Sequence, residues 1–252
     1  MSLDARRIAS LLATERFGRS LDVRERTGST NDDARDATDA PDGHVVLADA
    51  QDAGRGARGR SWASPGGTDL YFSIVVRRPG IELARLPPLT LAVGLGVARA
   101  CQAHTRAELS LKWPNDVVHA DAKLAGILVE SVSIGATLER VVIGVGVDVN
   151  RTDFGDLAPI ATSLRGITGE PLDRERVFAD ALLGIESEVD RFLAHGSAAI
   201  VPRVEARLAW KGREVDCDGA RGVLLGLRED GALRLATPTG ERPIVSGTLR
   251  LQ

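Results

Sequence analysis

Three stretches of the chain place apolar residues at the spacing of a helix. Residues 4–14 have apolar side chains on one face and predict a short amphipathic helix. Residues 89–103 are nearly all apolar or small and predict a core helix, despite two internal glycines. Residues 177–193 repeat apolar residues with acids between them and predict a long helix. Thr30, followed by acids, predicts a turn that opens another helix.

Shorter apolar and β-branched runs predict strands in the first four fifths of the chain. These runs are residues 44–48, 70–76, 109–113, 117–118, 124–131 and 141–149. Strands and helices are mixed without regular alternation, which favours an α+β fold with a mixed sheet over a doubly wound sheet.

The composition changes near Val204, and from there the chain reads as short strands and turns. The predicted strands are residues 214–217, 222–227, 232–235 and 244–251, with hairpin turns at Asp230-Gly231 and Thr239-Gly240. We therefore expect two domains, residues 1–203 and a small C-terminal all-β module of residues 204–252. The form expected for this module is an SH3-like barrel.

The charge balance limits the kinds of partner. The chain has 252 residues, 35 of them acidic and 32 basic, for a net charge of −3. Such a chain is not built to coat DNA or a membrane surface, so an anion site must come from locally gathered cations. The two cysteines and four histidines are scattered and predict neither a disulfide framework nor a zinc site. Without a signal peptide or membrane span, a cytoplasmic protein is expected.

A glycine-rich and arginine-rich stretch is the first candidate site. Residues 54–60 read Gly-Arg-Gly-Ala-Arg-Gly-Arg and are followed by Ser61 and Trp62. Glycines let the backbone approach a ligand, and arginines present planar forks to phosphate or carboxylate. The spacing is that of neither a Walker loop nor a Rossmann fingerprint. From composition alone, a solvated flexible loop is an equal alternative.

Three further motifs follow. Residues 112–116 read Lys-Trp-Pro-Asn-Asp and place a cation, an amide and a carboxylate at a strand end. Residues 123–130 open an apolar strand with a lysine, and residues 144–150 alternate glycines within a β-branched strand. Such glycines weaken a strand unless something packs close to its backbone. Taken singly, the first motif is better explained as a plain turn and the second as a solvated lysine at a hairpin end.

The order and combination of these motifs resemble the biotin protein ligases. The resemblance runs from about residue 29 to residue 150 and continues more weakly through the C-terminal module. It implies a mixed sheet flanked by helices, of the class II synthetase and lipoate ligase type, with an SH3-like C-terminal barrel. It also implies a monofunctional enzyme, because no N-terminal DNA-binding domain is recognisable.

The resemblance implies an ATP-dependent ligase with Mg²⁺ as its metal. The enzyme would form biotinyl-5'-AMP from biotin and ATP. It would then transfer biotin to a lysine of a biotin carboxyl carrier protein of an acyl-CoA carboxylase. Neither DNA nor a membrane is an expected partner, and both a monomer and a homodimer are open.

Residue roles are carried over motif by motif. The implied catalytic residues are Lys123, Arg55 and Lys112, and Asp116 would bind Mg²⁺ through the phosphates. Arg55 would hold the biotin carboxylate or the phosphate. The implied biotin-binding residues are Ser29, Thr30, Asn31, Gln51, Gly54, Arg55, Lys123, Gly126, Ile127, Gly144 and Gly146. The implied ATP-binding residues are Arg55, Gly56, Arg58, Gly59, Arg60, Trp62, Lys112, Asn115, Asp116, Lys123 and Asp148.

Two positions depart from the family pattern. Ala57 stands where the family usually has an arginine that helps to retain the adenylate, so we expect a leakier intermediate unless Arg58 substitutes. Asp148 stands where the family usually has asparagine near the nucleotide, and the sequence leaves open whether it is repelled by phosphate or binds metal. The alternatives are a lipoate or octanoate ligase on the same fold and a biotin sensor without turnover. Lys112 and Lys123 favour an enzyme over the sensor.

Overall fold

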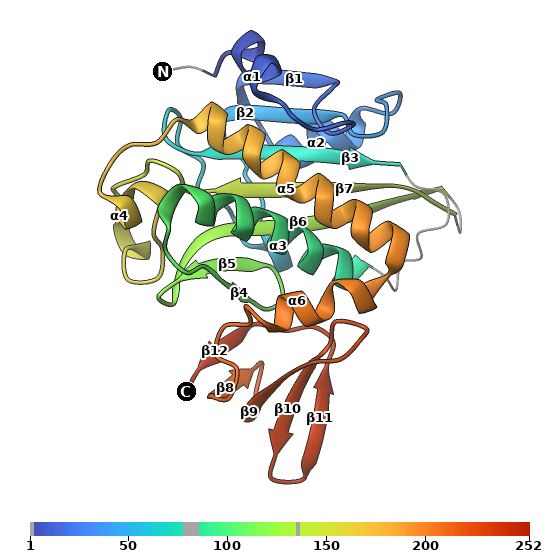
Figure 1. The fold of residues 1–252 in the computed structure, drawn as a ribbon, viewed down its shortest axis with the longest axis vertical. Helices are drawn as coiled ribbons and strands as arrows, with labels where there is room; N and C mark the ends of the chain where they lie inside the picture. Colours follow the sequence, from blue (N-terminus) through green and yellow to red (C-terminus); the bar gives the residue numbers. More distant parts are fainter. Residues whose placement is uncertain (1–2, 78–85, 135–136) are drawn as a thin grey trace.

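The computed structural model describes residues 3–77, 86–134 and 137–252, and a seven-stranded mixed sheet forms its centre (Figure 1). The strand order is β1-β2-β3-β7-β6-β5-β4, with β1 and β2 parallel and the other neighbours antiparallel. The strands are β1 (Leu21–Thr27), β2 (Val45–Gln51), β3 (Leu70–Val76), β4 (Ser110–Lys112), β5 (Asp116–His119), β6 (Ala122–Ile134) and β7 (Thr137–Val147). The fold is therefore α+β with a mixed sheet, as predicted.

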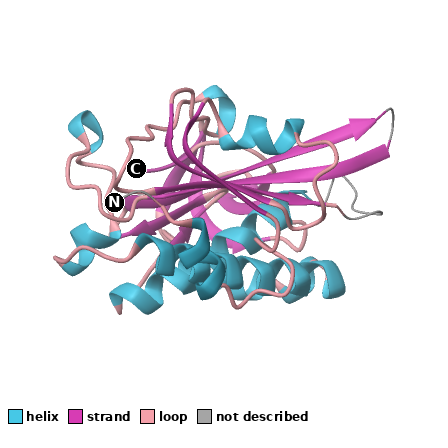
Figure 2. Cartoon of the chain, turned by 90° about the horizontal axis from the view of Figure 1, so that it is seen from above, coloured by secondary structure: helices cyan, strands magenta, loops and turns pink. Residues whose placement is uncertain are grey.

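Two long helices cover one face of this sheet. These helices, α3 (Leu86–Thr105) and α5 (Arg174–His195), pack on each other, and Figure 2 shows most helices gathered on one side of the strands. Gly96 explains why glycines are tolerated in α3: a Cβ there would lie 2.6 Å from the carbonyl oxygen of Gly184 in α5. The close crossing of the two backbones requires glycine on both helices.

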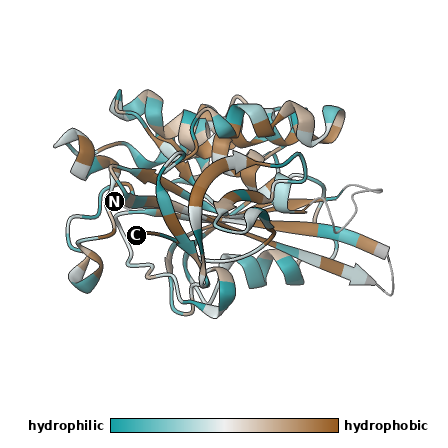
Figure 3. Ribbon diagram, turned by 90° about the horizontal axis from the view of Figure 1, so that it is seen from below, coloured by the Kyte–Doolittle hydropathy of each residue, from teal (hydrophilic) through white to brown (hydrophobic). Residues whose placement is uncertain are grey.

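The opposite face carries the shorter helix α2 (Thr30–Asp36). Because strand side chains alternate between faces, Val46 and Val75 pack with Ala34 of α2 in a small cluster. Their strand neighbours join the main core under α3 and α5. The apolar runs of the strands are visible along the sheet in Figure 3. Ser29 is the N-cap and Thr30 the first helical residue, so the cap lies one position before the predicted Thr30.

The C-terminal module is a separate five-stranded antiparallel sheet of order β11-β10-β9-β8-β12. Its strands are β8 (Glu214–Cys217), β9 (Ala220–Leu227), β10 (Leu233–Thr237), β11 (Gly240–Ile244) and β12 (Leu249–Leu251). Both predicted hairpin turns are confirmed, with Gly231 and Gly240 at φ +81° and +119°. The predicted strand over residues 244–251 is wrong, because β11 ends at Ile244 and β12 begins only at Leu249.

The remaining helices are short. They are α1 (Ala5–Leu11), α4 (Leu164–Thr168) and α6 (Val201–Glu205), with 3₁₀ turns η1 (Ala57–Gly59), η3 (Gly155–Leu157) and η4 (Ser197–Ala199). α1 lies within the predicted helix of residues 4–14, and β1, α4 and α6 were not predicted from the sequence. Within the described ranges, no helix is long and apolar enough to cross a membrane.

Candidate active site

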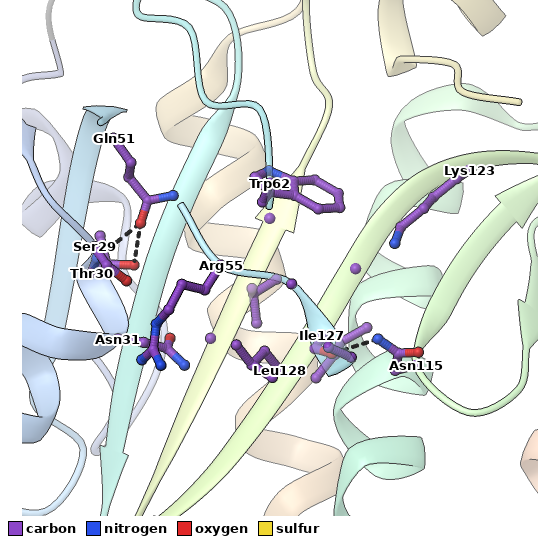
Figure 4. Close-up of a pocket in the computed structure, with 16 residues that line it drawn as sticks. Ser29, Thr30, Asn31, Gln51, Arg55, Trp62, Asn115, Lys123, Ile127 and Leu128 are labelled. Carbon is purple, nitrogen blue, oxygen red and sulfur yellow. Dashed lines mark hydrogen bonds between the residues drawn. The ribbon is translucent and has the colours of Figure 1, made fainter. Parts of the chain in front are cut away.

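A pocket opens over β6 and β7 where the end of β2, the start of α2 and the glycine-rich loop meet (Figure 4). We call it the first pocket. Its lining residues are Ser29, Thr30, Asn31, Gln51, Arg55, Gly56, Ala57, Trp62, Asn115, Lys123, Gly126, Ile127, Leu128, Gly144, Val145 and Gly146. Ten of the eleven predicted biotin-binding residues are thus brought together, and Gly54 is the exception.

Glycines form the floor of this pocket because other side chains occupy the space above them. A Cβ on Gly146 would lie 2.5 Å from the Trp62 ring, and one on Gly126 would lie 2.8 Å from the same ring. A Cβ on Gly144 would lie 2.1 Å from Asn31 Oδ1. The alternating glycines of β7 therefore let Trp62 and Asn31 approach the sheet, as the sequence pattern indicated.

One end of the pocket is polar and buried. Gln51 Oε1 accepts hydrogen bonds from the Thr30 backbone N–H at 2.9 Å and hydroxyl at 3.1 Å, and Gln51 Nε2 donates to Ser64 Oγ at 2.9 Å. The Ser73 hydroxyl lies 2.6 Å from Asn31 Oδ1. These hydrogen bonds fix the polar groups in place. The Gln51 amide has two N–H donors and uses one for Ser64, so the second is available to a ligand.

Arg55 lies at this polar end and is already paired. Its guanidinium donates two hydrogen bonds to Glu130, at 3.0 and 2.7 Å, and lies 2.9 Å from Asp32. Figure 4 shows Arg55 and Lys123 at opposite ends of the pocket. These contacts fasten the glycine-rich loop to β6. The predicted role of Arg55 in holding the biotin carboxylate or the phosphate stays a prediction.

Lys123 lies at the other end of the pocket. Its Nζ is 2.7 Å from Asp116 Oδ1 and 4.9 Å from the centre of the Trp62 ring. The backbone of Lys123 is fixed by hydrogen bonds with Ile160 and Thr162, each 2.8 Å long. An anchored backbone with a partly exposed ammonium group is suited to an anion that forms at this point.

A second pocket begins on the other side of Trp62. Its lining residues are Gly56, Ala57, Arg60, Ser61, Trp62, Ala63, Lys123, Asp148, Arg151, Phe154, Leu157, Ile160 and Ala161. Gly56, Ala57, Trp62 and Lys123 also line the first pocket, so the two pockets meet at Lys123. Asp148 is 4% exposed, and its burial raises its pKa well above the usual range, with Asp69 adding to the effect.

Four predicted residues lie elsewhere. Arg58 donates hydrogen bonds to Asp218 at 2.6 Å and to Thr248 at 2.8 Å in the C-terminal module, so it cannot substitute for an arginine at Ala57 in this conformation.

Gly54 lies under the loop, where a Cβ would meet Trp62 O at 2.5 Å, and Gly59 is at the open loop tip with φ +72°. Lys112 packs over the Trp210 ring at 4.9 Å, and burial lowers its pKa.

Asp116 fits a magnesium ion held mainly by substrate phosphates. Among the described residues, no three His, Cys, Asp or Glu side chains gather into a metal site. Asp116 Oδ1 is buried and has Lys123 as a charge partner, but no hydrogen bond of good geometry. Since Mg²⁺ usually binds one or two carboxylates together with phosphates, Asp116 supplies an adequate protein ligand.

Unpartnered polar atoms gather around these two pockets. Within the described ranges, five buried side-chain atoms have no hydrogen-bond partner: Arg55 Nε, Trp62 Nε1, Asp116 Oδ1, Arg140 Nε and Asp148 Oδ1. All but Arg140 belong to residues that line a pocket or pair with Lys123. Buried polar groups are rarely left unpaired without a ligand or water to serve, so this cluster marks a binding site.

Several site residues were missed from the sequence. Ser73, Glu130 and Asp32 hold the polar end, and the segment of residues 151–161 walls the second pocket. Glu130 carried a usable signal, because it is the one acid in an otherwise apolar strand run of residues 124–130. The segment 151–161 carried none, since its apolar residues have no period.

Comparison with known proteins places the chain in a family. The family model described as the biotin/lipoate A/B protein ligase family matches residues 20–148. The bifunctional ligase/repressor BirA of Bacillus spizizenii is 33% identical over 95% of this chain and 76% of its own length. The biotin–[acetyl-CoA-carboxylase] ligase of Mycobacterium tuberculosis is 35% identical over 90% of this chain and 86% of its own length.

A solved structure agrees. The biotin protein ligase from Aquifex aeolicus in complex with biotin and ATP superposes with a TM-score of 0.85 and 31% identity, covering 93% of this chain and 100% of that one. The family match covers half of the chain, and it spans the motifs that form the two pockets. This chain belongs to the biotin/lipoate A/B protein ligase family.

Proposed function

We infer that this chain is an ATP-dependent biotin protein ligase. It activates biotin as biotinyl-5'-AMP and transfers the biotinyl group to a lysine of a biotin carboxyl carrier protein. The observation that carries this inference is the meeting of two pockets at Lys123, one with a buried polar end and one with an aromatic and basic wall. An acyl adenylate needs such a pair of pockets, with its phosphate at their junction.

The polar end of the first pocket favours biotin over lipoate. The ureido ring of biotin has two N–H donors and a carbonyl acceptor. The buried residues Ser29, Thr30 and Asn31 and the half-buried Gln51 offer groups of both kinds. The dithiolane ring of lipoate would leave those buried groups unpaired, which is costly. With the ring at this end, the valerate chain runs over the glycine floor and its carboxylate reaches Lys123.

In the first step, a carboxylate oxygen of biotin attacks the α-phosphorus of ATP and diphosphate leaves. Both reactants are anions, so the barrier is largely electrostatic, and Lys123 and Arg60 supply positive charge at the pocket junction. When bound, Mg²⁺ would neutralise phosphate charge, with Asp116 as its protein ligand. Trp62 covers the junction and excludes water from the mixed anhydride.

In the second step, the amine of the carrier lysine attacks the acyl carbon of the adenylate. The new C–N bond replaces the C–O bond to phosphate, AMP leaves, and the amine loses a proton to solvent. The phosphate of the leaving AMP carries the charge that Lys123 faces. Lys123 therefore stabilises charge on the phosphate at the pocket junction in both steps.

The remaining assignments are proposals of the same kind. The proposed domain boundary between residues 203 and 204 falls inside α6, and the end of α6 at Glu205 and the start of β8 at Glu214 support a boundary a few residues later. Five short antiparallel strands suit an SH3-like barrel, although the observed strand order is that of an open sheet. A homodimer and a cytoplasmic location stay predictions.

The half-reaction tests the function without a carrier. Purified protein, ATP and Mg²⁺ should release diphosphate only when biotin is present, and the product should have the mass of biotinyl-AMP. Lipoate in place of biotin should give less than about a hundredth of the rate, since its ring leaves buried polar groups unpaired. Diphosphate release that is equal with biotin and lipoate would contradict the assignment.

A further inference from the structure

The glycine-rich loop is fixed at its base beside the seven-stranded sheet. The Trp62 N–H donates to Gly54 O at 2.8 Å, which closes the base of the loop, and the Arg55 guanidinium donates two hydrogen bonds to Glu130 of β6. These contacts hold the first and last residues of the loop. They do not reach its tip, residues 57–60, which is held by a separate contact.

The loop tip is bound to the C-terminal module through Arg58. The Arg58 guanidinium donates to Asp218 Oδ2 at 2.6 Å and to Thr248 Oγ1 at 2.8 Å. Within the described ranges, residues 57–60 make no other hydrogen bond outside the loop. One loop is therefore attached to both sheets of the protein, and Arg58 makes the attachment to the second.

The two acceptors are brought together by the strands of the C-terminal module. Asp218 follows β8 and Thr248 precedes β12, and these strands pair antiparallel with Cys217 opposite Leu249. The Thr248 N–H donates to Asp218 Oδ1 at 3.3 Å. Asp218 and Gly219 form the two-residue turn between β8 and β9, both with positive φ, as such hairpin turns require. The module therefore presents both oxygens whether or not the loop is bound to them.

The backbone of Arg58 is in a conformation that needs support. Its φ of +63° and ψ of +37° lie in the left-handed region, which a residue with a long side chain adopts infrequently. An unfavourable backbone conformation persists where surrounding contacts determine it, and the contacts of Arg58 are those with Asp218 and Thr248. Loss of these contacts therefore releases the loop tip.

The position of the tip sets the shape of the proposed adenylate site. Ala57 immediately precedes Arg58 and lines both pockets, and Arg60 lines the second pocket. The two pockets meet at Lys123, which faces the phosphate on the proposed function. A loop that moves away at its tip opens this junction to solvent, and substrates and products need such an opening to enter and leave.

The contact of Arg58 is weak enough to break in each catalytic cycle. The side chains of Arg58 and Asp218 are 48% and 41% exposed, and exposed ion pairs contribute little to stability and are screened by salt. We propose that Asp218 and Thr248 are positioning residues, which through Arg58 hold the glycine-rich loop closed over the adenylate and slow its escape. We call the contact of these three residues the loop latch. This inference rests on the proposed function, because the adenylate is the ligand that the loop would cover.

The rate at which the adenylate escapes tests the loop latch. After a single turnover of biotin and Mg·ATP without a carrier, mass spectrometry of the filtrate measures free biotinyl-AMP against time. Asp218→Asn removes the charge and keeps a residue that suits the turn, and Thr248→Val removes the second acceptor. Each should raise the release rate by about two- to fivefold, the range expected for an exposed contact. Unchanged release in both variants would overturn the proposal.

Glu241→Gln is the matched control. Glu241 pairs with Arg234 inside the C-terminal module, and its side chain is 46% exposed, close to the exposure of Asp218. This variant changes the charge of the module by the same amount without touching the loop, so its release rate should equal that of the wild type. An equal rise in Glu241→Gln and Asp218→Asn would overturn the proposal. Slower release in Asp218→Asn would also overturn it, because a freed Arg58 would then be binding the adenylate itself.

Two further comparisons separate a positioning role from a general structural one. Arg58→Gln and Asp218→Asn remove the partners of one contact, so the double variant should release the adenylate no faster than the faster single variant. Rising salt should speed release from the wild type but not from the double variant, because salt screens the ion pair. Additive effects, or the same salt dependence in both proteins, would overturn the proposal.

Hydrogen exchange tests the loop latch without catalysis. In the full-length protein without substrates, exchange in peptides covering residues 54–62 should be faster in Asp218→Asn than in the wild type and in Glu241→Gln. Equal exchange in all three proteins would overturn the loop latch. A wild type that forms no biotinyl-AMP would refute the ligase assignment, whereas equal release from active proteins would refute only the loop latch.

Discussion

Lys123 Nζ lies 2.7 Å from Asp116 Oδ1, yet that oxygen has no well-directed hydrogen bond. The pair is an ion pair held by position: Lys123 is the second residue of the long strand β6 and Asp116 begins the neighbouring β5, and the two strands are hydrogen-bonded to each other. The carboxylate holds the ammonium group at the pocket junction, and it remains available to a metal ion.

Removing the Asp116 charge should lower adenylate formation more than biotin binding. In Asp116→Asn we expect kcat for biotin-dependent diphosphate release to fall by about 10²-fold, since the carboxylate that would bind the metal ion and that positions the Lys123 ammonium group is lost. The affinity for biotin, measured by calorimetry, should change little. Asp36→Asn, an exposed position with a 76% exposed side chain, is the matched control. An unchanged kcat in Asp116→Asn would refute this role.

The glycine floor should tolerate no side chain under Trp62. In Gly146→Ala the new Cβ would meet the indole ring at 2.5 Å and displace it. We expect about a tenfold or larger rise in KM for biotin, because overpacking typically costs about 1–3 kcal/mol. Gly28→Ala is the control, since a Cβ there meets no atom within 4 Å. Equal KM values for the two variants would show that Trp62 does not cover the ligand.

Ala57 should make the adenylate leak. Ala57 lines both pockets at their junction, and Arg58 is tied to Asp218 and so offers no replacement cation. Introducing Ala57→Arg should lower the rate at which free biotinyl-AMP leaves the enzyme, by about tenfold for one added charged hydrogen bond. Mass spectrometry of the filtrate after a single turnover measures the release. The same release from both proteins would contradict this expectation.

The protonated state of Asp148 should make stability depend on pH. The burial that raises its folded-state pKa means that the native state binds a proton that the unfolded state loses above about pH 4. Stability therefore falls as pH rises from about 4 toward the folded pKa. Asp148→Asn has no such proton, so its denaturation midpoint should fall less than that of the wild type between about pH 5 and about pH 8.

Urea titrations without ligand, repeated at each pH, measure how the denaturation midpoint changes with pH. The same change of midpoint with pH in both proteins would instead mean that Asp148 is ionised in the folded state. Asp69 contributes to both proteins alike, because its pKa is also raised by burial in spite of the three hydrogen bonds that its carboxylate accepts.

The sequence predicted the residues of the site better than their contacts. The local pattern indicated the glycine floor, because glycines within a strand weaken it unless something packs close to the backbone. Lys123 was assigned a role only through the family resemblance. The partners of Arg55 were not predictable in this way. Glu130 lies 75 residues away along the chain, and only the pairing of strands brings it to the loop.

The scarcity of lysine in the chain supports a functional role for Lys123. The chain has three lysines, Lys112, Lys123 and Lys211, among 32 basic residues. Arginine thus serves as its ordinary surface cation, while Lys123 lies in the site and Lys112, outside both pockets, pairs in the sheet with Asp116. A compact, mobile ammonium group suits a reacting oxygen where a planar fork does not.

Biotin transfer to a carrier lysine, with Lys123 as the catalytic lysine, is tested most directly by the intact mass of the carrier. Purified protein, biotin, ATP and Mg²⁺ should add the mass of one biotinyl group to a biotin carboxyl carrier domain. Lys123→Ala should abolish this gain, whereas Lys211→Ala, at an exposed lysine, should retain it. An unchanged carrier mass with the wild type, or an equal gain with Lys123→Ala, would contradict the account.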